Sequence, residues 1–266
     1  MAEESKTTQP RQRKVIPAPG ELPDAKRDAA RAFEALKAGG VIIVPTDVGY
    51  GMMAASVEAI ERFFAAKKRK AGHSLGIIGT YNLHKKLHDL PEEKYQVAGT
   101  FLEEMGVTIS VVGKMRENIH ELLPSHLLPT LDKVTKNGTL AMAFAESPFH
   151  RELGRLNDLN GQIMIGSSAN LTGQGQKFRV EDIEPEVLEA ADLVIDYGRQ
   201  KYHFSGRAGT ILDLDNERVL RIGACYPLIA EGLTRWFGWS VPEDPDWDPN
   251  QKELGISIKR EGGFKV

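Results

Sequence analysis

Short apolar runs alternate with stretches of helical periodicity along most of this chain. Each apolar run is bounded by glycine, proline or polar residues, which is a pattern typical of buried strands. The expected strands are residues 41–44, 75–78, 107–112, 139–144, 163–165 and 193–195, and residues 210–214 and 218–222 are expected to form a hairpin about Asp215 and Asn216.

Helical stretches separate these strands. Asp24 is expected to cap a helix that ends at Gly39 and Gly40, and Ser56 is expected to cap a second helix. The remaining expected helices are residues 82–105, 148–156, 180–191 and 227–236. Because strands and helices alternate but their connections are irregular, the pattern predicts a single α/β domain built on a mixed sheet.

The two ends of the chain differ in character from its centre. Residues 1–20 are polar and hold three prolines, so they are expected to form a flexible N-terminal tail. Residues 21–238 carry the predicted domain. Residues 239–266 begin with prolines and acidic residues and end in a basic, glycine-containing stretch, which predicts a C-terminal tail.

The composition is that of an ordinary globular chain and excludes several classes of protein. Of the 266 residues, 41% are hydrophobic and 27% are charged. The net charge of -3 argues against bulk attraction to nucleic acid, but it does not exclude a local basic groove. The single cysteine, Cys225, excludes an internal disulfide and a multi-cysteine metal site.

No apolar stretch approaches the ~20 residues that a membrane span needs, so no membrane partner is expected. The N-terminal residues lack the apolar core of a secretory signal. A cytoplasmic protein is therefore the expectation, with a mitochondrial transit peptide as the weaker alternative.

The seven histidines are scattered and form no metal-binding motif. His84 and His88 lie four residues apart on one expected helix, but no third ligand is near them in the sequence. We therefore expect this pair to face solvent, and no metal ligand of the protein is predicted.

Three short segments carry the candidate chemistry, and two of them follow expected strands. Hydroxyls and glycines at strand ends, together with a pair of cations, supply fixed donors for phosphate oxygens. The combination predicts a site for an anionic ligand, most simply a nucleotide. In chain order the segments contain Thr46 and Tyr50, then Lys67 and Arg69, then Gly166, Ser168 and Asn170.

Each segment taken alone also has a purely structural interpretation. Cations at the end of a helix complement the helix dipole. Ser168 and Asn170 can form a turn that satisfies its own hydrogen bonds, and Gly49 and Gly51 can simply permit a turn. The functional interpretation therefore rests on the order and combination of the three segments.

In that order, these segments and others downstream resemble the YrdC/Sua5/YciO family over residues 24–232. The resemblance implies a single YrdC-like domain with a twisted mixed α/β sheet, flanking helices and a large concave basic cavity. It is carried by Pro45-Thr46-Asp47-Val48-Gly49-Tyr50-Gly51, Lys67-Lys68-Arg69, Val107-Thr108, Ser168-Ala169-Asn170-Leu171-Thr172-Gly173, Gly209-Thr210-Ile211-Leu212-Asp213-Leu214 and Leu220-Arg221-Ile222-Gly223.

The resemblance also implies an activity. Family enzymes form threonylcarbamoyl-AMP from L-threonine, bicarbonate and ATP and release pyrophosphate, and the product supplies the threonylcarbamoyl modification of tRNA adenosine. Mg²⁺ is expected to accompany ATP. Binding of double-stranded RNA has also been ascribed to the family.

The family motifs assign expected roles by position. Lys67 and Arg69 would be catalytic and would hold the triphosphate, which stabilises charge on the leaving pyrophosphate. The other expected ATP-binding residues are Thr108, Ser168, Asn170 and Arg221, and the expected substrate-binding residues are Thr46, Tyr50, Gly166 and Thr210.

Five positions hold a smaller or less polar residue than the family pattern. Losing hydrogen-bonding groups weakens recognition of a polar amino acid. The acceptor therefore stays open between threonine and another amine, and the alternative function is a non-catalytic module that binds nucleotide or RNA. The five positions are Val48, Ile78, Ala143, Ala145 and Gly209.

Overall fold

Eleven strands form one sheet in the computed structural model, which describes residues 13–18, 21–68 and 75–246. The strands are β1 (Arg13–Val15), β2 (Val41–Thr46), β3 (Gly49–Ala54), β4 (Gly76–Ile78), β5 (Ser110–Lys114), β6 (Thr135–Lys136), β7 (Thr139–Ala143), β8 (Met164–Ser168), β9 (Leu193–Ile195), β10 (Ile211–Asp213) and β11 (Arg218–Arg221). Their order across the sheet is β1-β9-β2-β3-β8-β4-β7-β5-β10-β11, with β6 paired to β7 outside this path. Parallel and antiparallel neighbours both occur, which confirms the predicted mixed sheet.

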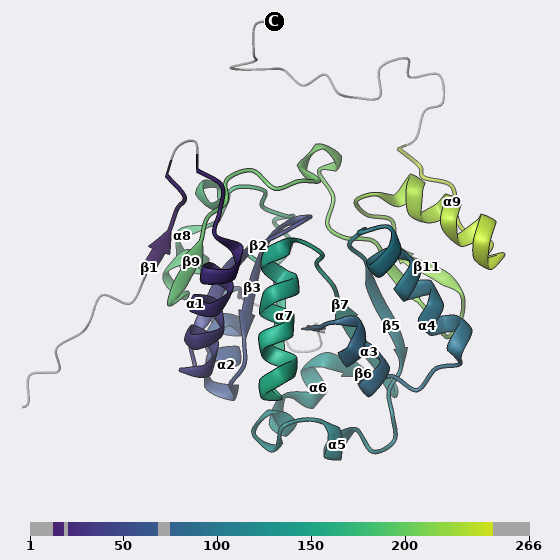
Figure 1. Ribbon diagram of the computed structural model, residues 1–266, viewed down its shortest axis with the longest axis horizontal. Helices are drawn as coiled ribbons and strands as arrows, with labels where there is room; N and C mark the ends of the chain where they lie inside the picture. The colour runs from purple at the N-terminus through teal and green to yellow at the C-terminus, as the bar shows by residue number, and fades with distance from the viewer. Residues whose placement is uncertain (1–12, 19–20, 69–74, 247–266) are drawn as a thin grey trace, which may run out of the picture.

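Helices flank this sheet (Figure 1). Among the described residues, no helix is long and apolar enough to cross a membrane. The α-helices are α1 (Ala25–Lys37), α2 (Val57–Ala66), α3 (Tyr81–Leu87), α4 (Glu92–Gly99), α5 (Ile119–Leu122), α6 (Leu131–Val134), α7 (Pro148–Asn160), α8 (Pro185–Glu189) and α9 (Tyr226–Phe237), and the short π- and 3₁₀-helical turns are η1 (Thr100–Glu104), η2 (Ser125–Thr130), η3 (Val180–Asp182) and η4 (His203–Ser205).

Local sequence signals set the ends of the longer helices. The Asp24 carboxylate accepts a hydrogen bond from the Arg27 amide at 3.0 Å at the start of α1. Ser56 caps α2 in the same way through the Ala59 amide. Gly161 ends α7 in the left-handed conformation, where a side chain would be strained. The predicted caps of the first two helices are therefore confirmed.

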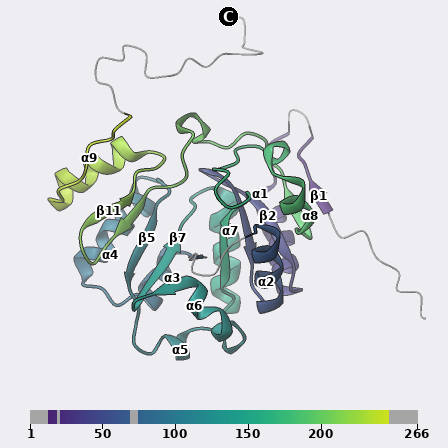
Figure 2. The same cartoon turned by 180° about the vertical axis from the view of Figure 1, so that it is seen from behind.

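Alternate residues of β2 point to opposite faces of the sheet and separate two apolar clusters. Ile42 and Val44 belong to the cluster that α1 and α7 cover, whereas Val41 and Ile43 belong to the cluster that includes α2. Figure 1 shows α1 and α7 side by side, and Figure 2 shows α2 and α8 together on the opposite side. The central strands are thus buried on both faces.

The sequence suggested that the first motif is a loop, but in the structure most of it belongs to two paired strands. Asp47 and Val48 alone form the turn, and β3 begins at Gly49 and pairs antiparallel with β2. All six residues of β3 are buried. The strand was missed because residues buried on both faces lack the period-two alternation that marks a half-exposed strand.

The expected helix over residues 180–191 is also wrong. The chain forms the short turn η3 and then α8, with Ile183 and Glu184 extended between them. Pro185 follows Glu184, and a proline restricts the preceding residue to extended conformations. The apolar periodicity of this stretch reflects burial of Val180, Ile183 and Val187 rather than one helix.

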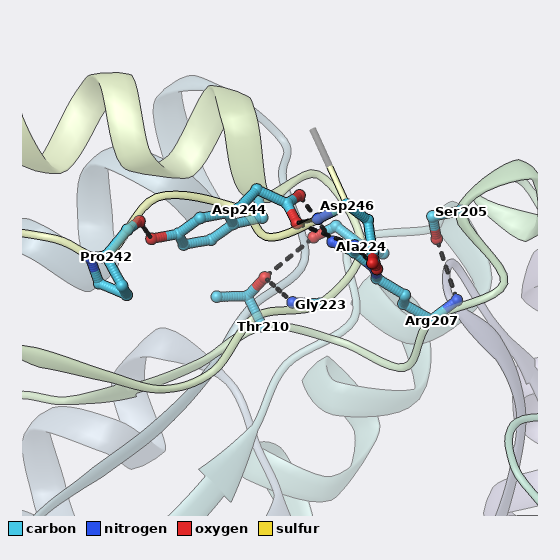
Figure 3. A network of polar contacts seen from close by, with 9 residues as sticks. Ser205, Arg207, Thr210, Gly223, Ala224, Pro242, Asp244 and Asp246 are labelled. Atoms are coloured by element: carbon cyan, nitrogen blue, oxygen red, sulfur yellow. Dashed lines mark hydrogen bonds and ion pairs between the residues drawn. The ribbon is translucent and has the colours of Figure 1, made fainter. Parts of the chain in front are cut away.

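Both predicted tail boundaries need correction. Residues 13–15 of the expected N-terminal tail form β1, which pairs in parallel with β9. At the other end, Trp239 is only 3% exposed in the core, and Arg207 forms an ion pair with Asp244 at 2.7 Å. Figure 3 shows this ion pair beside the contact of Asp246 with the same guanidinium. Trp239 therefore belongs to the packed body, and Asp244 and Asp246 hold the segment that follows it against Arg207.

His84 and His88 are fully buried, in contrast to the solvent-facing pair that we expected. Their Nδ1 atoms are 2.8 Å apart, and His88 Nε2 lies 3.1 Å from the Leu140 carbonyl. Since Nε2 must donate to that carbonyl, His88 Nδ1 accepts from His84. Burial lowers the pKa of His84 to about 3 and also lowers the pKa of His88, so the pair is neutral and structural.

A third buried histidine makes the stability of this fold depend on pH. His150 Nε2 lies 3.0 Å from the Pro45 carbonyl, and burial lowers the pKa of His150 to about 4. The unfolded chain binds a proton here below pH 6.5, whereas the native chain does not. The contribution of neutral His150 to the free energy of unfolding is therefore fully present above pH 6.5, and it is lost as the pH decreases toward 4.

When the pH falls from 7 to 5, we expect His150→Gln to lose about 2 kcal/mol less of its free energy of unfolding than the unmodified chain loses. Urea denaturation at the two pH values measures this difference. The control is His120→Gln, at an exposed position, which should leave the pH dependence as it is in the unmodified chain. Equal pH dependence in all three proteins would contradict the neutral state of His150.

Candidate functional site

A cavity of about 380 Å³ lies over the central strands of the sheet. Its lining combines Thr46 at the end of β2, Ser168 at the end of β8, Thr108 before β5 and Arg221 at the end of β11. Strand pairing brings these residues together although they span most of the chain. The first motif, the Ser-Ala-Asn segment and the final Leu-Arg segment thus share one cavity.

The floor of the cavity is set by strand register, because directly opposed residues of neighbouring strands face the same side of a sheet. One lateral row is Met53, Gly166 and Gly76 on β3, β8 and β4. A second lateral row crosses β4, β7, β5, β10 and β11. It consists of Ile78, Ala143, Ser110, Ile211 and Arg221.

Glycines leave part of this floor as bare backbone. A Cβ atom on Gly76 would meet nothing nearer than the Ala141 carbonyl oxygen at 3.7 Å, so the missing side chain opens the cavity. A Cβ atom on Gly166 would lie only 2.8 Å from the Met52 carbonyl oxygen. Gly166 is therefore required by the close approach of β3, in addition to lining the cavity.

Two hydroxyls at the cavity already donate their protons within the protein. Thr46 Oγ1 donates to the Gly49 carbonyl at 2.8 Å, and Thr108 Oγ1 donates to the Phe144 carbonyl at 2.9 Å. Each oxygen keeps lone pairs that can accept from a ligand. These two residues therefore suit an amino or ammonium group better than a phosphate oxygen.

Tyr50 lines the cavity, but its hydroxyl does not serve it. The hydroxyl donates to the Gly198 carbonyl at 2.7 Å, lies 3.1 Å from Asp196 Oδ1 and accepts from the Tyr197 amide. Burial, and then the negative charge of Asp196, raise the pKa of Tyr50 above its usual value. The Tyr50 hydroxyl thus joins β3 to the segment after β9, and because Tyr50 is fully buried, its position gives no support to the expected ligand contact.

Arg221 carries the only charge among the described residues that line the cavity. Its Nε donates to the Gly209 carbonyl at 2.9 Å, which fixes the guanidinium at the end of the second row. Desolvation lowers the pKa of Arg221, and the group stays positively charged. The expected basic character of the cavity depends further on Arg69, which lies outside the described residues.

Lys67 does not line the cavity and is only 2% exposed. Its ammonium donates to the carbonyls of Ser168 and Asn170, the latter at 2.6 Å. Its own carbonyl accepts from the Thr172 amide and the Thr172 hydroxyl. Lys67 thus fixes the loop that presents Ser168, rather than reaching into the cavity itself.

Asn170 and Thr210 are also buried and absent from the cavity lining. The Asn170 side-chain amide donates to the Leu171 carbonyl and shapes the same loop. The Thr210 hydroxyl donates to the Ala224 carbonyl at 3.1 Å and accepts from the Gly223 amide, as Figure 3 shows. Thr210 therefore joins β10 to the chain after β11, and its position gives no support to the expected substrate contact.

Gln176 and Ser110 line the cavity although the sequence did not single them out. The Gln176 side-chain amide donates to the Tyr50 carbonyl at 3.1 Å, which folds the loop after β8 over the first motif. No local pattern marks this residue. Ser110 follows Thr108 by two positions in an extended segment, and this spacing could have placed both on one face.

Carboxylates are missing from the described part of the lining, and the described residues form no group of three potential metal ligands. Asp47, which could hold a cation in principle, is buried, and its Oδ2 accepts from the Glu146 amide at 2.9 Å. The described lining residues therefore offer no carboxylate that could hold a Mg²⁺ ion.

The fold, a mixed sheet with flanking helices, is of the Sua5/YciO/YrdC type. The Sua5/yciO/yrdC family model, described as Telomere recombination, matches residues 34–223. The chain belongs to this family. A curated protein of Methanocaldococcus jannaschii named "Putative threonylcarbamoyl-AMP synthase" is 23% identical over 193 residues, which cover 69% of this chain and 79% of that protein.

Solved structures share the fold at low sequence identity. Protein smu.1377c of Streptococcus mutans UA159 superposes with a TM-score of 0.68 at 21% identity, over 88% of this chain and 97% of that one. YciO of E. coli gives 0.57 at 20% identity, over 80% and 94%. Sua5 of P. abyssi, solved with L-threonine, gives 0.58 at 21% identity, over 80% of this chain and 56% of that one.

The buried position of Lys67 generates a prediction about stability. Lys67→Met keeps the aliphatic stem but leaves the Ser168 and Asn170 carbonyls without their charged donor. We expect a loss of about 3 kcal/mol in the free energy of unfolding, because hydrogen bonds to charged groups are costly to break when buried. Urea denaturation measures this loss.

The neighbouring residue supplies a matched control. Lys68 forms an exposed ion pair with Glu186, and such pairs contribute little. Lys68→Met should leave the urea midpoint nearly unchanged. A midpoint for Lys67→Met that equals that of Lys68→Met would mean that Lys67 does not hold the loop.

Proposed function

We propose that this chain is an ATP-dependent synthase of the threonylcarbamoyl-AMP type. Its substrates are ATP, bicarbonate and an amino acid, and its product would serve the threonylcarbamoyl modification of tRNA. The observation that carries the proposal is the single cavity that unites Thr46, Thr108, Ser168 and Arg221. Family membership and the name of the M. jannaschii relative support it.

The proposed reaction has two steps. The amine nitrogen bonds to the bicarbonate carbon as water leaves, and a carbamate oxygen then bonds to the α-phosphorus of ATP as pyrophosphate leaves. Holding the carbamate and the α-phosphate in line contributes much of the rate enhancement in such a reaction. A rigid cavity floor of paired strands suits this alignment.

The residues take distinct roles in this proposal. Arg221 and Arg69 bind anionic groups, and fixed cations stabilise the charge that develops on leaving pyrophosphate. Thr46 and Thr108 accept from amino groups. Lys67 is a positioning residue that holds Ser168 in place, which differs from the direct catalytic role expected from the motif. Mg²⁺ bound to the phosphates would neutralise part of their charge.

Release of pyrophosphate from ATP, bicarbonate and a panel of amino acids tests the proposal. We expect Arg221→Ala to lower kcat/KM by about 10- to 100-fold, because it removes charge-assisted hydrogen bonds of about 1.5–3 kcal/mol. Arg235→Ala, an exposed position on α9, should not change it. No pyrophosphate with any amino acid, despite nucleotide binding, would favour the alternative of a non-catalytic binding module.

Filling the cavity provides a steric test that does not depend on charge. A Cβ atom on Gly209 would lie 3.8 Å from Val48 Cγ2 and 4.0 Å from Ser110 Oγ, at ordinary contact distances. Gly209→Leu should therefore fold but occupy the cavity, and we expect at least a tenfold loss of ATP affinity in calorimetric titrations. Gly209→Ala is the control that should retain most of the affinity. If Gly209→Leu folded and bound ATP normally, the nucleotide would have to bind elsewhere.

A further inference from the structure

The Gln176 side chain takes the space that a side chain on Gly49 would fill. A Cβ atom on Gly49 would lie only 2.1 Å from Gln176 Nε2, and the φ angle of +136° at Gly49 also disfavours a side chain. Gln176 Nε2 donates to the Tyr50 carbonyl at 3.1 Å, and the Tyr50 amide donates to the Lys177 carbonyl at 2.8 Å. These contacts hold the Gln176 carboxamide against the start of β3.

The Gln176 carboxamide leaves one acceptor for a ligand. Gln176 lines the cavity and is half-buried. No described residue donates a hydrogen bond to its Oε1 atom, and this oxygen is not among the buried atoms that lack a partner. Oε1 is therefore accessible and accepts from a bound molecule that carries an N–H or O–H group.

Thr46 supplies a second acceptor beside the same glycine. Thr46 and Gly49 are directly opposed on β2 and β3, and Thr46 Oγ1 donates to the Gly49 carbonyl at 2.8 Å. Thr46 lines the cavity, and no described residue donates to its hydroxyl oxygen, so the lone pairs remain for a ligand. Thr46 Oγ1 and Gln176 Oε1 thus both adjoin Gly49.

The charged residues that follow the two acceptors in the chain already have partners. Asp47 Oδ2 accepts from the Glu146 amide at 2.9 Å, and Lys177 forms an ion pair with Glu184 at 2.7 Å. The described part of the cavity lining holds no carboxylate, whereas Arg221 brings a positive charge to it. Both features disfavour a second positive charge in this cavity.

An amine therefore fits between these acceptors best when it is uncharged. An ammonium ion that leaves water needs a negative charge nearby, and a hydroxyl and a carboxamide oxygen supply none. An uncharged primary amine has two N–H groups, which match the two oxygens, and one lone pair, which needs no partner from the protein.

We propose that Gln176 Oε1 and Thr46 Oγ1 bind the amine of the amino-acid substrate in its uncharged form. This inference rests on the proposed function and adds Gln176 to the residues that act in it. Because the two N–H groups donate to the two oxygens, the nitrogen lone pair stays free. The lone pair bonds to the bicarbonate carbon, one N–H proton passes to the departing oxygen, and that oxygen leaves as water.

Proton release on binding tests this inference in the full chain. The amine of free L-threonine is mainly protonated at pH 7, so binding of the uncharged form must release about one proton per molecule bound. Calorimetric titration with L-threonine measures this number in buffers of different ionisation enthalpy, with Mg²⁺ and a non-hydrolysable ATP analogue present. Binding without proton release, or no binding of L-threonine, would overturn the proposal.

Two substitutions distinguish amine binding from a structural role of Gln176. Gln176→Met keeps the length of the side chain but removes the acceptor, so the Kd for L-threonine should rise about 5- to 50-fold, whereas the Kd for the ATP analogue should not change. Gln176→Glu places a carboxylate beside the amine. Since the ammonium ion then has its counter-charge, proton release should fall toward zero.

Gln174→Met is the matched control, because Gln174 is an exposed residue of the same loop that does not line the cavity. It should leave both Kd values and the proton release unchanged. An equal rise of both Kd values in Gln176→Met would show that Gln176 acts only through the structure. That result, or full proton release in Gln176→Glu, would overturn the role of Gln176.

Pyrophosphate release measured on the same samples separates this inference from the synthase function. Threonine binding with proton release but without pyrophosphate would contradict the synthase function and leave the amine site in place. Pyrophosphate release by a chain that binds threonine without releasing a proton would keep the synthase function and overturn the assignment of the uncharged amine.

Discussion

A buried ammonium group is the interaction on which the site depends. Lys67 Nζ donates to the Ser168 and Asn170 carbonyls, and the Lys67 carbonyl accepts from Thr172. A desolvated ammonium is stable only with such partners, so this side chain has one favourable position. The end of α2 is thereby joined in both directions to the loop after β8, more than 100 residues away along the chain. The place of Ser168 at the cavity follows from this bond together with the pairing of Ser168 and Gly51 between β8 and β3.

The sheet supplies the rigidity that this loop needs. The strands under the cavity are paired on both sides, and apolar clusters cover both faces of β2 and β3. Gly76 and Gly166 lie next to each other in one lateral row, and the open space above Gly76 widens the cavity. The cavity is thus shaped by strand register and by missing side chains.

The motif residues divide into two groups when their surroundings are known. Ser168, Thr108 and Arg221 line the cavity, whereas the Lys67 ammonium, the Asn170 amide nitrogen and the Thr210 hydroxyl donate within the protein. The second group holds in place the segments that carry the first. Some residues of a family motif therefore hold the fold together, whereas others line the cavity. The hydrogen-bond partner of each side chain tells the two kinds of residue apart.

The sequence by itself determined the elements with local signals: the caps at Asp24 and Ser56, the apolar strands around residues 41–44 and 163–165, and the family to which the chain belongs. Caps and apolar periodicity depend on residues only a few positions apart, so the sequence alone is enough to recognise them. Only the tertiary structure decided that β3 is a strand, that His84 and His88 are buried, and that Ile78, Ala143, Ser110, Ile211 and Arg221 form one row. These features depend on register between strands that are distant in the chain, and on which face a neighbouring element covers. Neither is encoded in the spacing of nearby residues.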